Sequence, residues 1–424
     1  MRIALLAFHF RPDEAVGAIR PENWANWLAE EHEVHVVTRA AGAGPSDASA
    51  DAAAPYRVVR TRSRAIALIE TLNAWRKRAR LQRAVAQAGQ ARAAGGPAKV
   101  GSGVLTYRMP CLHDLWLPSA YRALQSIRPE LVIATHSPYI SLVTALLYCL
   151  NHPDTKLWVD FRDLWADDHK STGLPPFSLL ERYLEKRALA RAEVVSTVSQ
   201  GLQAALDRSL GAARTRLIYN CPGQCADAAA SAPRPAGAPL TLSYTGSLFD
   251  AWRDPAPLLQ RLVALRADGR IAPDAVRFCV ASNHPGSLLE VAHRLGAEGF
   301  VDFRGALPRA ESIALQRQSD ILVLLESPAP EARGVLTGKL FEYLATDKPI
   351  LALGPDQHSE ISRVLEQHSR RLSLDDLERI LDGRMSLPKQ QPVDYALVSR
   401  QQLLAAVRSL AAPDRDAAGG CQPQ

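Results

Sequence analysis

The chain has 424 residues, which corresponds to two or three domains of ordinary size. Hydrophobic residues make up 47% of it and charged residues 22%, so the composition excludes a disordered or fibrous chain. The 50 Lys and Arg against 44 Asp and Glu give a net charge of +6, which over this length does not by itself indicate nucleic-acid binding.

The first forty residues predict a strand, a loop, a helix and a second strand. The apolar run at residues 3–8 is typical of a strand buried on both faces of a parallel sheet, and it is too short for the core of a signal peptide. Trp24, Trp27 and Leu28 recur at helical spacing behind Pro21, and EVHVVT then reads as a strand. Together these elements form a βαβ unit.

Two segments interrupt the pattern. Residues 40–54 are rich in Ala and Gly and predict a loop. Residues 57–92 hold ten Lys or Arg and one acid, Glu70, and their apolar residues share a helical face: Ile66, Ile69, Leu72 and Trp75. Such a helix suits an anionic membrane surface, and an ordinary solvated helix is the alternative. Nucleic acid is a poorer partner, because no aromatic platform accompanies the basic run.

Alternating strand and helix patterns continue on both sides of a Pro/Ala-rich stretch at residues 226–239. The apolar runs before it are YRVVR, LVIAT, KLWVD, EVVSTV and RLIY, and those after it are LTLSYTG, AVRFCVAS, GFVDFRG, ILVLL and PILALG. This alternation predicts an α/β protein with two doubly wound parallel sheets. The expected organisation is a domain at 1–225, a linker at 226–239, a domain at 240–390, a helix at 391–412 that returns to the first domain, and a polar tail at 413–424.

The first half offers candidate residues where strands end, which is where doubly wound folds place ligands. Gly17 lies just before the first helix, where a glycine lets an anion or a sugar approach the backbone. Arg20 lies near the start of the same helix, where a positive charge is unfavourable unless an anion is nearby. His136 follows LVIAT, and it either contacts a hydroxyl or caps the strand. After KLWV, two carboxylates bracket an arginine, in the order Asp160, Arg162 and Asp163. They either bind sugar hydroxyls or form an internal salt bridge.

The second half contains a sharper segment, GVLTGKLFEYLATDKPILALGP. Thr337 and Gly338 precede a short helix, and Lys339 and Glu342 lie three residues apart on one face of it. Lys339 near the glycine suits a diphosphate, and Glu342 one turn further suits the hydroxyls of a ribose. The alternative is a surface ion pair.

No metal or other cofactor is expected. Cys221 and Cys225 have no second Cys or His pair near them, and the pair Asp160 and Asp163 has no evident third hard ligand. An Asp-x-Asp sequence does occur, but it lies in the polar tail at residues 414–416.

The segment TGKLFEYLATDKPILALGP resembles the nucleotide-sugar signature of family-4 retaining glycosyltransferases of the GT-B fold, in the branch that builds bacterial O-antigen and exopolysaccharide. Weaker likenesses occur in chain order at FHFRPDEAVGAIRPENWANWLAEEHEVHVVT, VDFRDLWADD, VSTVSQGL, RLIYNCPG, YTGSLFDAWRDPAPLL and FRGALPRAESIALQRQSDILVLL. The resemblance implies two Rossmann-like domains that face a central cleft.

The resemblance also implies roles for particular residues. The diphosphate sugar meets Gly17 in the first domain, Arg253 and Lys339 neutralise the leaving diphosphate, and Glu342 binds the ribose. Gly246, Thr337 and Gly338 complete the donor-binding set, whereas Arg20 and Arg162 belong to the acceptor or sugar side. The catalytic candidates are His136, Asp160 and Asp163. Members often carry a Glu eight positions before the ribose-binding one, and here that position is Gly334, so the pair is incomplete.

The implied function is transfer, with retention, of a hexosyl or N-acetylhexosaminyl group from a nucleotide-diphosphate sugar to a lipid-linked saccharide in surface polysaccharide synthesis. The protein is expected in the cytoplasm, peripheral on the inner face of the cell membrane. Two alternatives stay open. A nucleotide-sugar epimerase of the same fold would interconvert sugars without an acceptor, and a non-catalytic saccharide-binding protein would do neither.

Overall fold

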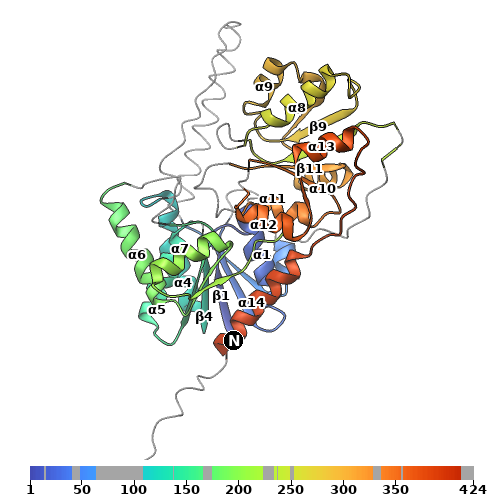
Figure 1. Ribbon diagram of the computed structural model, residues 1–424. Helices are drawn as coiled ribbons and strands as arrows, with labels where there is room; N and C mark the ends of the chain where they lie inside the picture. Colours follow the sequence, from blue (N-terminus) through green and yellow to red (C-terminus); the bar gives the residue numbers. More distant parts are fainter. Residues whose placement is uncertain are drawn as a thin grey trace, which may run out of the picture. The chain divides into compact units, whose positions relative to one another are not determined.

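The computed structural model describes residues 1–13, 16–40, 48–63, 108–136, 138–165, 174–222, 234–235, 237–248, 253–327, 336–354 and 357–411. The chain divides into two compact units. The N-terminal unit comprises residues 1–198, 203–218 and 400–424, and the C-terminal unit comprises residues 199–202 and 219–399. Each is built on one parallel sheet (Figure 1).

The N-terminal unit has a seven-stranded sheet in the order β3-β2-β1-β4-β5-β6-β7. The strands are β1 (Arg2–Leu6), β2 (Glu33–Arg39), β3 (Arg57–Thr61), β4 (Leu131–Thr135), β5 (Lys156–Phe161), β6 (Val194–Thr197) and β7 (Thr215–Leu217). The helices are α1 (Val16–Leu28), α2 (Ala48–Ala53), η1 (Leu112–Trp116), α4 (Leu117–Ile127), α5 (Ile140–Asn151), α6 (Phe177–Arg191), α7 (Gln200–Leu210) and α14 (Tyr395–Ala411). Every neighbouring pair of strands is parallel, as the long apolar runs predict.

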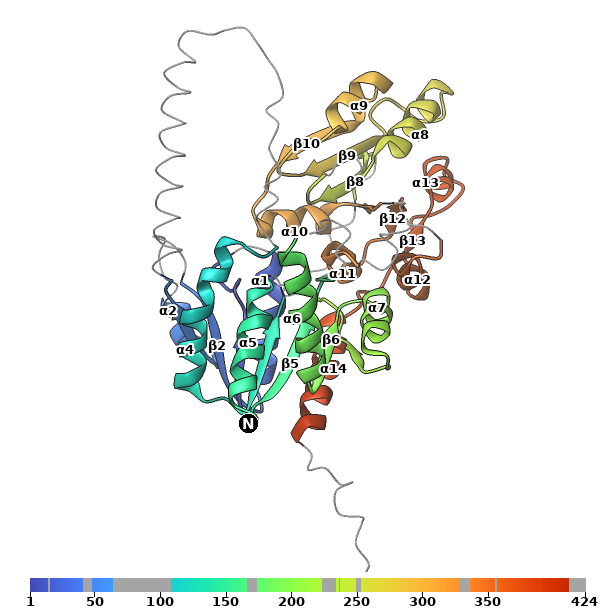
Figure 2. The same cartoon turned by 90° about the vertical axis from the view of Figure 1, so that its left-hand side faces the viewer.

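The strand period of two assigns alternate residues of β5 to the two faces of this sheet. Leu157, Val159 and Phe161 pack in the core with α4, α5 and α6, which lie side by side on one face (Figure 2). Trp158 points to the opposite face, where its ring contacts Trp24 of α1 at 5.7 Å. Asp160 shares that second face and therefore lies beneath α1.

Helix α14 also belongs partly to the N-terminal unit. Its residues Arg400 and Arg408 bond to Glu30 and Glu31, which directly follow α1, with Nε–Oε distances of 3.1 and 3.2 Å. The end of α14 is further fixed where the Lys156 ammonium donates to the Leu410 carbonyl. Of the helices in the described ranges, none has the length and hydrophobicity needed to cross a bilayer.

The C-terminal unit has a six-stranded sheet in the order β10-β9-β8-β11-β12-β13. The strands are β8 (Leu240–Thr245), β9 (Val276–Ala281), β10 (Val301–Gly305), β11 (Ile321–Leu325), β12 (Ile350–Leu353) and β13 (Arg371–Leu372). The helices are α8 (Ala256–Ala267), α9 (Leu288–Leu295), η2 (Glu298–Phe300), α10 (Arg309–Gln318), α11 (Gly338–Leu344), α12 (Glu360–Gln367) and α13 (Leu374–Leu381). One core packs α8, α9 and α13 on the sheet, and a second packs α11 and α12 on its other face.

The predicted strands are all present, one prediction about local structure needs correction, and one short strand was missed. Part of residues 40–54, expected as a loop, forms the short helix α2, whose Asp51 pairs with Arg60 of β3 at 2.7 Å. The two-residue strand β13 was not predicted, because so short a strand leaves no periodic signal. The basic run beyond residue 63, Gly334, Cys225 and residues 414–416 lie outside the described residues.

Candidate functional site

At the carboxyl edge of the first sheet, Asp160 is fully buried in an ion pair with Arg20. The Arg20 guanidinium donates from Nε and Nη2 to the two Asp160 oxygens at 2.9 and 2.8 Å. Thr135 and Ser196 donate to the same carboxylate at 2.9 and 2.7 Å. Burial works against ionisation, but the charge of Arg20 and these hydrogen bonds prevail and lower the pKa of Asp160. Arg20 is the fifth residue of α1, and the anion that balances its charge is the internal carboxylate of Asp160.

Arg162, which follows β5, links the end of β4 to the start of α1. Its Nε donates to the carbonyl of His136 after β4, and its Nη1 donates at 2.9 Å to the carbonyl of Gly17 in α1. Burial lowers the pKa of Arg162 to about 10, with Asp160 opposing the shift. A Cβ on Gly17 would meet Arg162 Nη2 at 3.4 Å, an ordinary contact, so these neighbours do not require glycine at position 17.

The His136 ring lies in a stack of three buried rings. It is parallel to Tyr139 with ring centroids 4.1 Å apart, and Tyr139 is parallel to Trp165 at 4.7 Å. Only 2% of His136 is exposed, whereas Asp163 is partly exposed. Of the three catalytic candidates, Asp163 is thus the one that solvent reaches, and Asp160 and His136 form part of the framework around it.

At the carboxyl edge of the second sheet, Lys339 passes over Gly246. A Cβ built on Gly246 would lie 2.0 Å from Lys339 Cε and 2.7 Å from its Nζ, and the residue has a φ of +134°. Glycine alone both leaves room for the lysine side chain and adopts this positive φ at low cost. The ammonium lies 5.3 Å from the centre of the Tyr244 ring, within the range of a cation–π contact. The end of β8 is therefore shaped to receive the Lys339 side chain.

Arg253 and Glu326 lie beside this lysine. Arg253 donates to the Ser247 carbonyl at 2.9 Å, and its Nη2 is 3.8 Å from Glu326 Oε2. Glu326 directly follows β11, and its carbonyl oxygen is only 1.9 Å from where a Cβ on Gly354 would be, so the adjacent strand end must also be glycine. Glu326 was not among the predicted site residues, although its carboxylate comes directly after the ILVLL strand.

Among the described residues around Lys339, the charges do not cancel. Arg253 and Lys339 bring two cations, and Glu326 brings one carboxylate that is 13% exposed. Burial, reinforced by the charge of Arg253, lowers the pKa of Lys339 to about 8, while Glu326 and Glu342 oppose the shift. Burial raises the pKa of Glu326, and the two cations oppose that shift. An anion bound beside Lys339 would raise the pKa of its ammonium group and so keep it protonated.

Glu342 lies one turn after Lys339 in α11 and has its own partners. Arg309 Nη1 is 3.0 Å from Glu342 Oε1, and Gln316 Nε2 donates to Oε2 at 3.4 Å. Gln316 is buried and also donates to Thr245 at the end of β8 at 2.8 Å. The Glu342 side chain is 20% exposed, so its carboxylate remains accessible to a hydroxyl. Arg309 and Gln316 are further residues that sequence analysis did not select.

The remaining members of the predicted set begin α11. Thr337 is its N-cap residue and Gly338 its first residue, and the Thr337 carbonyl accepts from the Leu340 N–H at 3.2 Å. Within the C-terminal unit, the structure thus brings Gly246, Arg253 and Lys339 together, with Glu342 on the same helix. Among the described residues, no three Cys, His, Asp or Glu side chains are grouped as a metal site.

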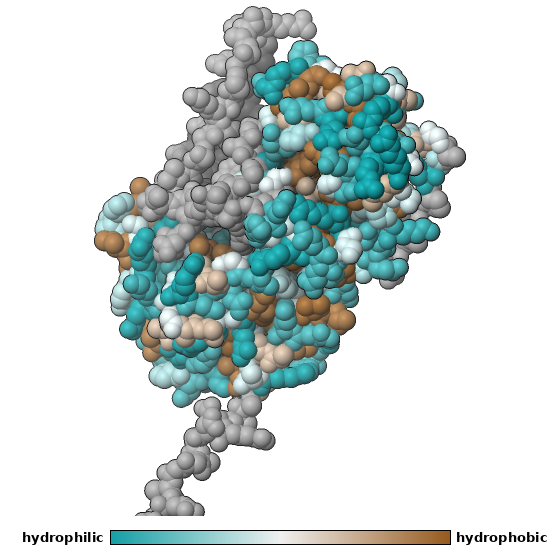
Figure 3. Space-filling model, viewed as in Figure 1, coloured by the Kyte–Doolittle hydropathy of each residue, from teal (hydrophilic) through white to brown (hydrophobic). Residues whose placement is uncertain are grey.

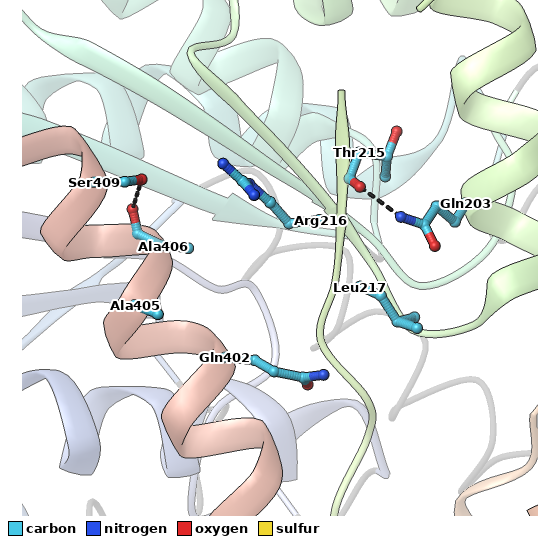
Figure 4. A pocket seen from close by; sticks show the side chains of 8 residues that line it. All are labelled: Gln203, Thr215, Arg216, Leu217, Gln402, Ala405, Ala406 and Ser409. Carbon is cyan, nitrogen blue, oxygen red and sulfur yellow. Dashed lines mark hydrogen bonds between the residues drawn. The ribbon is translucent and has the colours of Figure 1, made fainter. Parts of the chain in front are cut away.

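A separate hollow of about 440 Å³ lies in the N-terminal unit between α14 and β7 (Figure 4). Ala405 and Ala406 line one side, and Gln203 donates to the Thr215 carbonyl on the other at 2.7 Å. Arg216 is its one charged lining residue, so the hollow offers no acid–base pair and contains no candidate named above.

The Asp160→Asn substitution is expected to destabilise the protein by about 3–5 kcal/mol, because Arg20 would keep its charge in a buried place without a counter-charge. Asp302→Asn is the matched control, since it breaks a pair with the exposed Arg304 and is expected to cost less than about 1 kcal/mol. Urea denaturation measures both. Equal losses in the two variants would contradict the structural role of Asp160.

A family model matches about half of the chain. Residues 17–223 match the model described as the glycosyl transferase 4-like domain. No curated protein gives a significant match to the sequence.

Several solved structures share the architecture over nearly the whole chain. Sucrose-phosphate synthase from Thermosynechococcus elongatus is 16% identical with a TM-score of 0.56, and the match covers 96% of this chain and 94% of that one. An Escherichia coli structure described as trehalose-6-phosphate bound with UDP-2-fluoro glucose is 10% identical with a TM-score of 0.55, covering 96% of each chain. The N-terminal domain of trehalose-6-phosphate phosphatase from Candida albicans is 10% identical with a TM-score of 0.53, covering 95% and 93%.

At these identities the structures are evidence of fold. The two Rossmann-like parallel sheets are those of the GT-B fold, which confirms the predicted fold class. The family match likens residues 17–223 to glycosyl transferase 4-like domains.

Proposed function

We propose that this protein is a retaining glycosyltransferase that moves a hexosyl or N-acetylhexosaminyl group from a nucleotide-diphosphate sugar to a lipid-linked saccharide. We place the reaction in bacterial surface polysaccharide synthesis, in the O-antigen and exopolysaccharide branch, at the cytoplasmic face of the membrane. The observation that carries the proposal is the surplus of positive charge that Arg253 and Lys339 bring to the described part of the site. The Lys339 side chain passes over Gly246 at the end of β8.

Charge neutralisation is the chemical contribution of these two cations. A diphosphate leaves readily once its developing charge is balanced, and fixed cations in a partly buried site balance it without reorganisation. Arg253 is held by the Ser247 carbonyl and Glu326, so it is already oriented before the donor binds. Glu342, oriented by Arg309 and Gln316 and partly exposed, is assigned to the ribose hydroxyls.

The acceptor side is assigned to the carboxyl edge of the first sheet. Asp163 is the candidate for contact with a saccharide hydroxyl, because Asp160 and His136 are buried. Arg162 acts as a positioning residue, since it fixes the carbonyls of Gly17 and His136. No side chain is required as a covalent nucleophile.

Incubation with a panel of nucleotide sugars, followed by measurement of nucleoside diphosphate release, tests the proposed function. Release that depends on a saccharide acceptor supports transfer. Interconversion of the sugar without an acceptor would identify an epimerase, and binding without any turnover would identify a saccharide-binding protein. Either result would refute the proposal.

Lys339→Ala and Glu342→Gln are each expected to lower turnover at least tenfold with little change in melting temperature. The loss of one charge-assisted hydrogen bond, worth about 1.5–3 kcal/mol, is enough for that factor. Lys348→Ala and Glu366→Gln serve as controls, since these residues form ion pairs elsewhere in the same unit. Unchanged donor kinetics in the first two variants would remove the site assignment.

The affinity for the donor is expected to fall as the pH rises through about 8. The low pKa of Lys339 means that the free protein loses this proton there, and the neutral amine cannot balance a diphosphate. If binding requires the protonated lysine, the affinity for the donor falls about tenfold per pH unit once the pH is well above the pKa of Lys339. Glu326→Gln should move it to lower pH, because the carboxylate supports the ammonium.

Calorimetric titration of a nucleoside diphosphate at several pH values measures this dependence. Lys339→Ala is the control, and its weaker binding should be flat between pH 7 and 9. An unchanged pH profile in Lys339→Ala would show that another group titrates.

Activity is expected to need no metal ion, because Arg253 and Lys339 supply the positive charge that a metal would supply. The measurement is turnover after treatment with EDTA and again after addition of magnesium or manganese. Activity that EDTA abolishes and either metal restores would overturn this expectation.

A further inference from the structure

The beginning of α6 carries large apolar side chains that face solvent. Leu179 is 69% exposed and Tyr183 is 58% exposed, and both lie on the outward side of the helix. Three further exposed apolar residues surround them, and we call the five together the apolar tip: Leu174, Phe177, Leu179, Leu180 and Tyr183. Hydrophobic residues are visible on the left-hand edge of Figure 3, where α6 lies in Figure 1. Single exposed leucines are common in proteins, but a contiguous group of this size marks an interaction surface.

The inward face of α6 prevents the helix from rotating to bury this tip. Glu181 is fully buried and accepts from Arg108 Nε and Nη2 at 2.9 and 2.7 Å, and from the Met109 N–H at 2.9 Å. Ala188 and Leu189 belong to the core on the same side of the helix. A bidentate buried ion pair and packed core residues thus fix which side of α6 faces outward.

The exposed side of the next turns is basic. Arg182, Lys186 and Arg187 are exposed, while the two acids of the helix are turned inward, with Glu181 buried and Glu185 half-buried. The outward surface of α6 therefore has apolar side chains at its start and positively charged side chains in the turns that follow. This is the pattern of helices that lie in the interface of a bilayer with anionic lipids.

Helix α6 connects β5 to β6, and this connection places its apolar tip near the proposed acceptor side. Because β5 and β6 are parallel, α6 must start at the carboxyl edge and return to the amino edge. Its apolar tip is therefore at the edge where Asp163 and Arg162 follow β5. Arg108, which follows the basic segment in the chain, is bonded to Glu181 of the same helix.

We propose that the apolar tip, with Arg182, Lys186 and Arg187, is a docking surface for an anionic lipid bilayer. The five apolar side chains insert shallowly, and the three cations meet the headgroups. The inference deepens the proposed function by naming the element that meets the membrane, and it does not depend on catalysis, because bilayer binding is measured without donor or acceptor.

Flotation of the full chain with vesicles tests the proposal, using phosphatidylcholine alone and phosphatidylcholine with phosphatidylglycerol, at low and high salt. The double variant Leu179→Ser/Tyr183→Ser is expected to reduce partition at least about tenfold, because two large apolar groups no longer leave water. Lys186→Gln/Arg187→Gln is expected to reduce binding to the anionic vesicles alone, about fivefold for each cation at low salt.

The control is Leu289→Ser/Leu397→Ser, which removes two leucines of the C-terminal unit that are 46% and 48% exposed. It should bind vesicles as the unmodified protein does. Donor turnover with a water-soluble acceptor should be unchanged in all of these variants, which separates this proposal from the enzymatic one.

Unaltered flotation of the Leu179→Ser/Tyr183→Ser variant would overturn the proposal, as would an equal loss in the control. A variant in which Arg76, Lys77, Arg78 and Arg80 are all changed to Gln tests the basic segment of residues 57–92 separately. If that change alone abolished binding and the α6 variants bound normally, the basic segment and not α6 would be the docking element.

Discussion

The ammonium of Lys339 occupies the space that a side chain on residue 246 would need, and the candidate donor site is organised around this fit. The lysine can pass over the end of β8 only because Gly246 has no Cβ and accepts a φ of +134°. From there its charge adds to that of Arg253, and both share the one buried carboxylate of Glu326. Gly354 lets Glu326 approach, because any side chain there would strike the glutamate backbone. Gly246 and Gly354 follow β8 and β12, the strands on either side of β11, and together they make room for a partly buried site with surplus positive charge among the described residues.

The carboxyl edges of the two sheets use charge in opposite ways. In the N-terminal unit Arg20 is balanced by Asp160, which has two further donors in Thr135 and Ser196. The charge of Arg20 at that edge is thus balanced within the protein. Arg162 hydrogen-bonds to the carbonyls of His136 and Gly17 and so connects the end of β4 to α1. Among the described residues of the C-terminal unit, Arg253 and Lys339 lie beside the single carboxylate of Glu326, while Glu342 is paired with Arg309, so a surplus of positive charge remains. The same topological position therefore serves as a framework in one sheet and as a candidate binding site in the other.

Much of the fold could be predicted from the sequence, because continuous apolar runs and helical spacing are local signals. The twelve strands expected from those runs are present, and the C-terminal helix expected at residues 391–412 is α14, Tyr395–Ala411. The partner of each charged residue could not be predicted in the same way. Asp160 was expected at the end of the KLWVD strand, either binding a sugar hydroxyl or in an internal salt bridge. The salt bridge is present, but the alternation of β5 turns Asp160 under α1, toward an arginine 140 residues away. Arg309 and Gln316 were missed for the same reason, since their roles depend on contacts between distant segments. Glu326 differs, because its place directly after the ILVLL strand is a local signal.

Calorimetric titration of nucleoside diphosphates and the matching monophosphates tests the central claim most directly, that Arg253 and Lys339 bind a diphosphate. The account predicts that at least one diphosphate binds clearly more tightly than its monophosphate, and that Arg253→Gln reduces this difference at least about tenfold, the effect of losing a charged hydrogen bond. Equal binding of diphosphate and monophosphate, or an Arg253→Gln variant that retains the full preference, would contradict it.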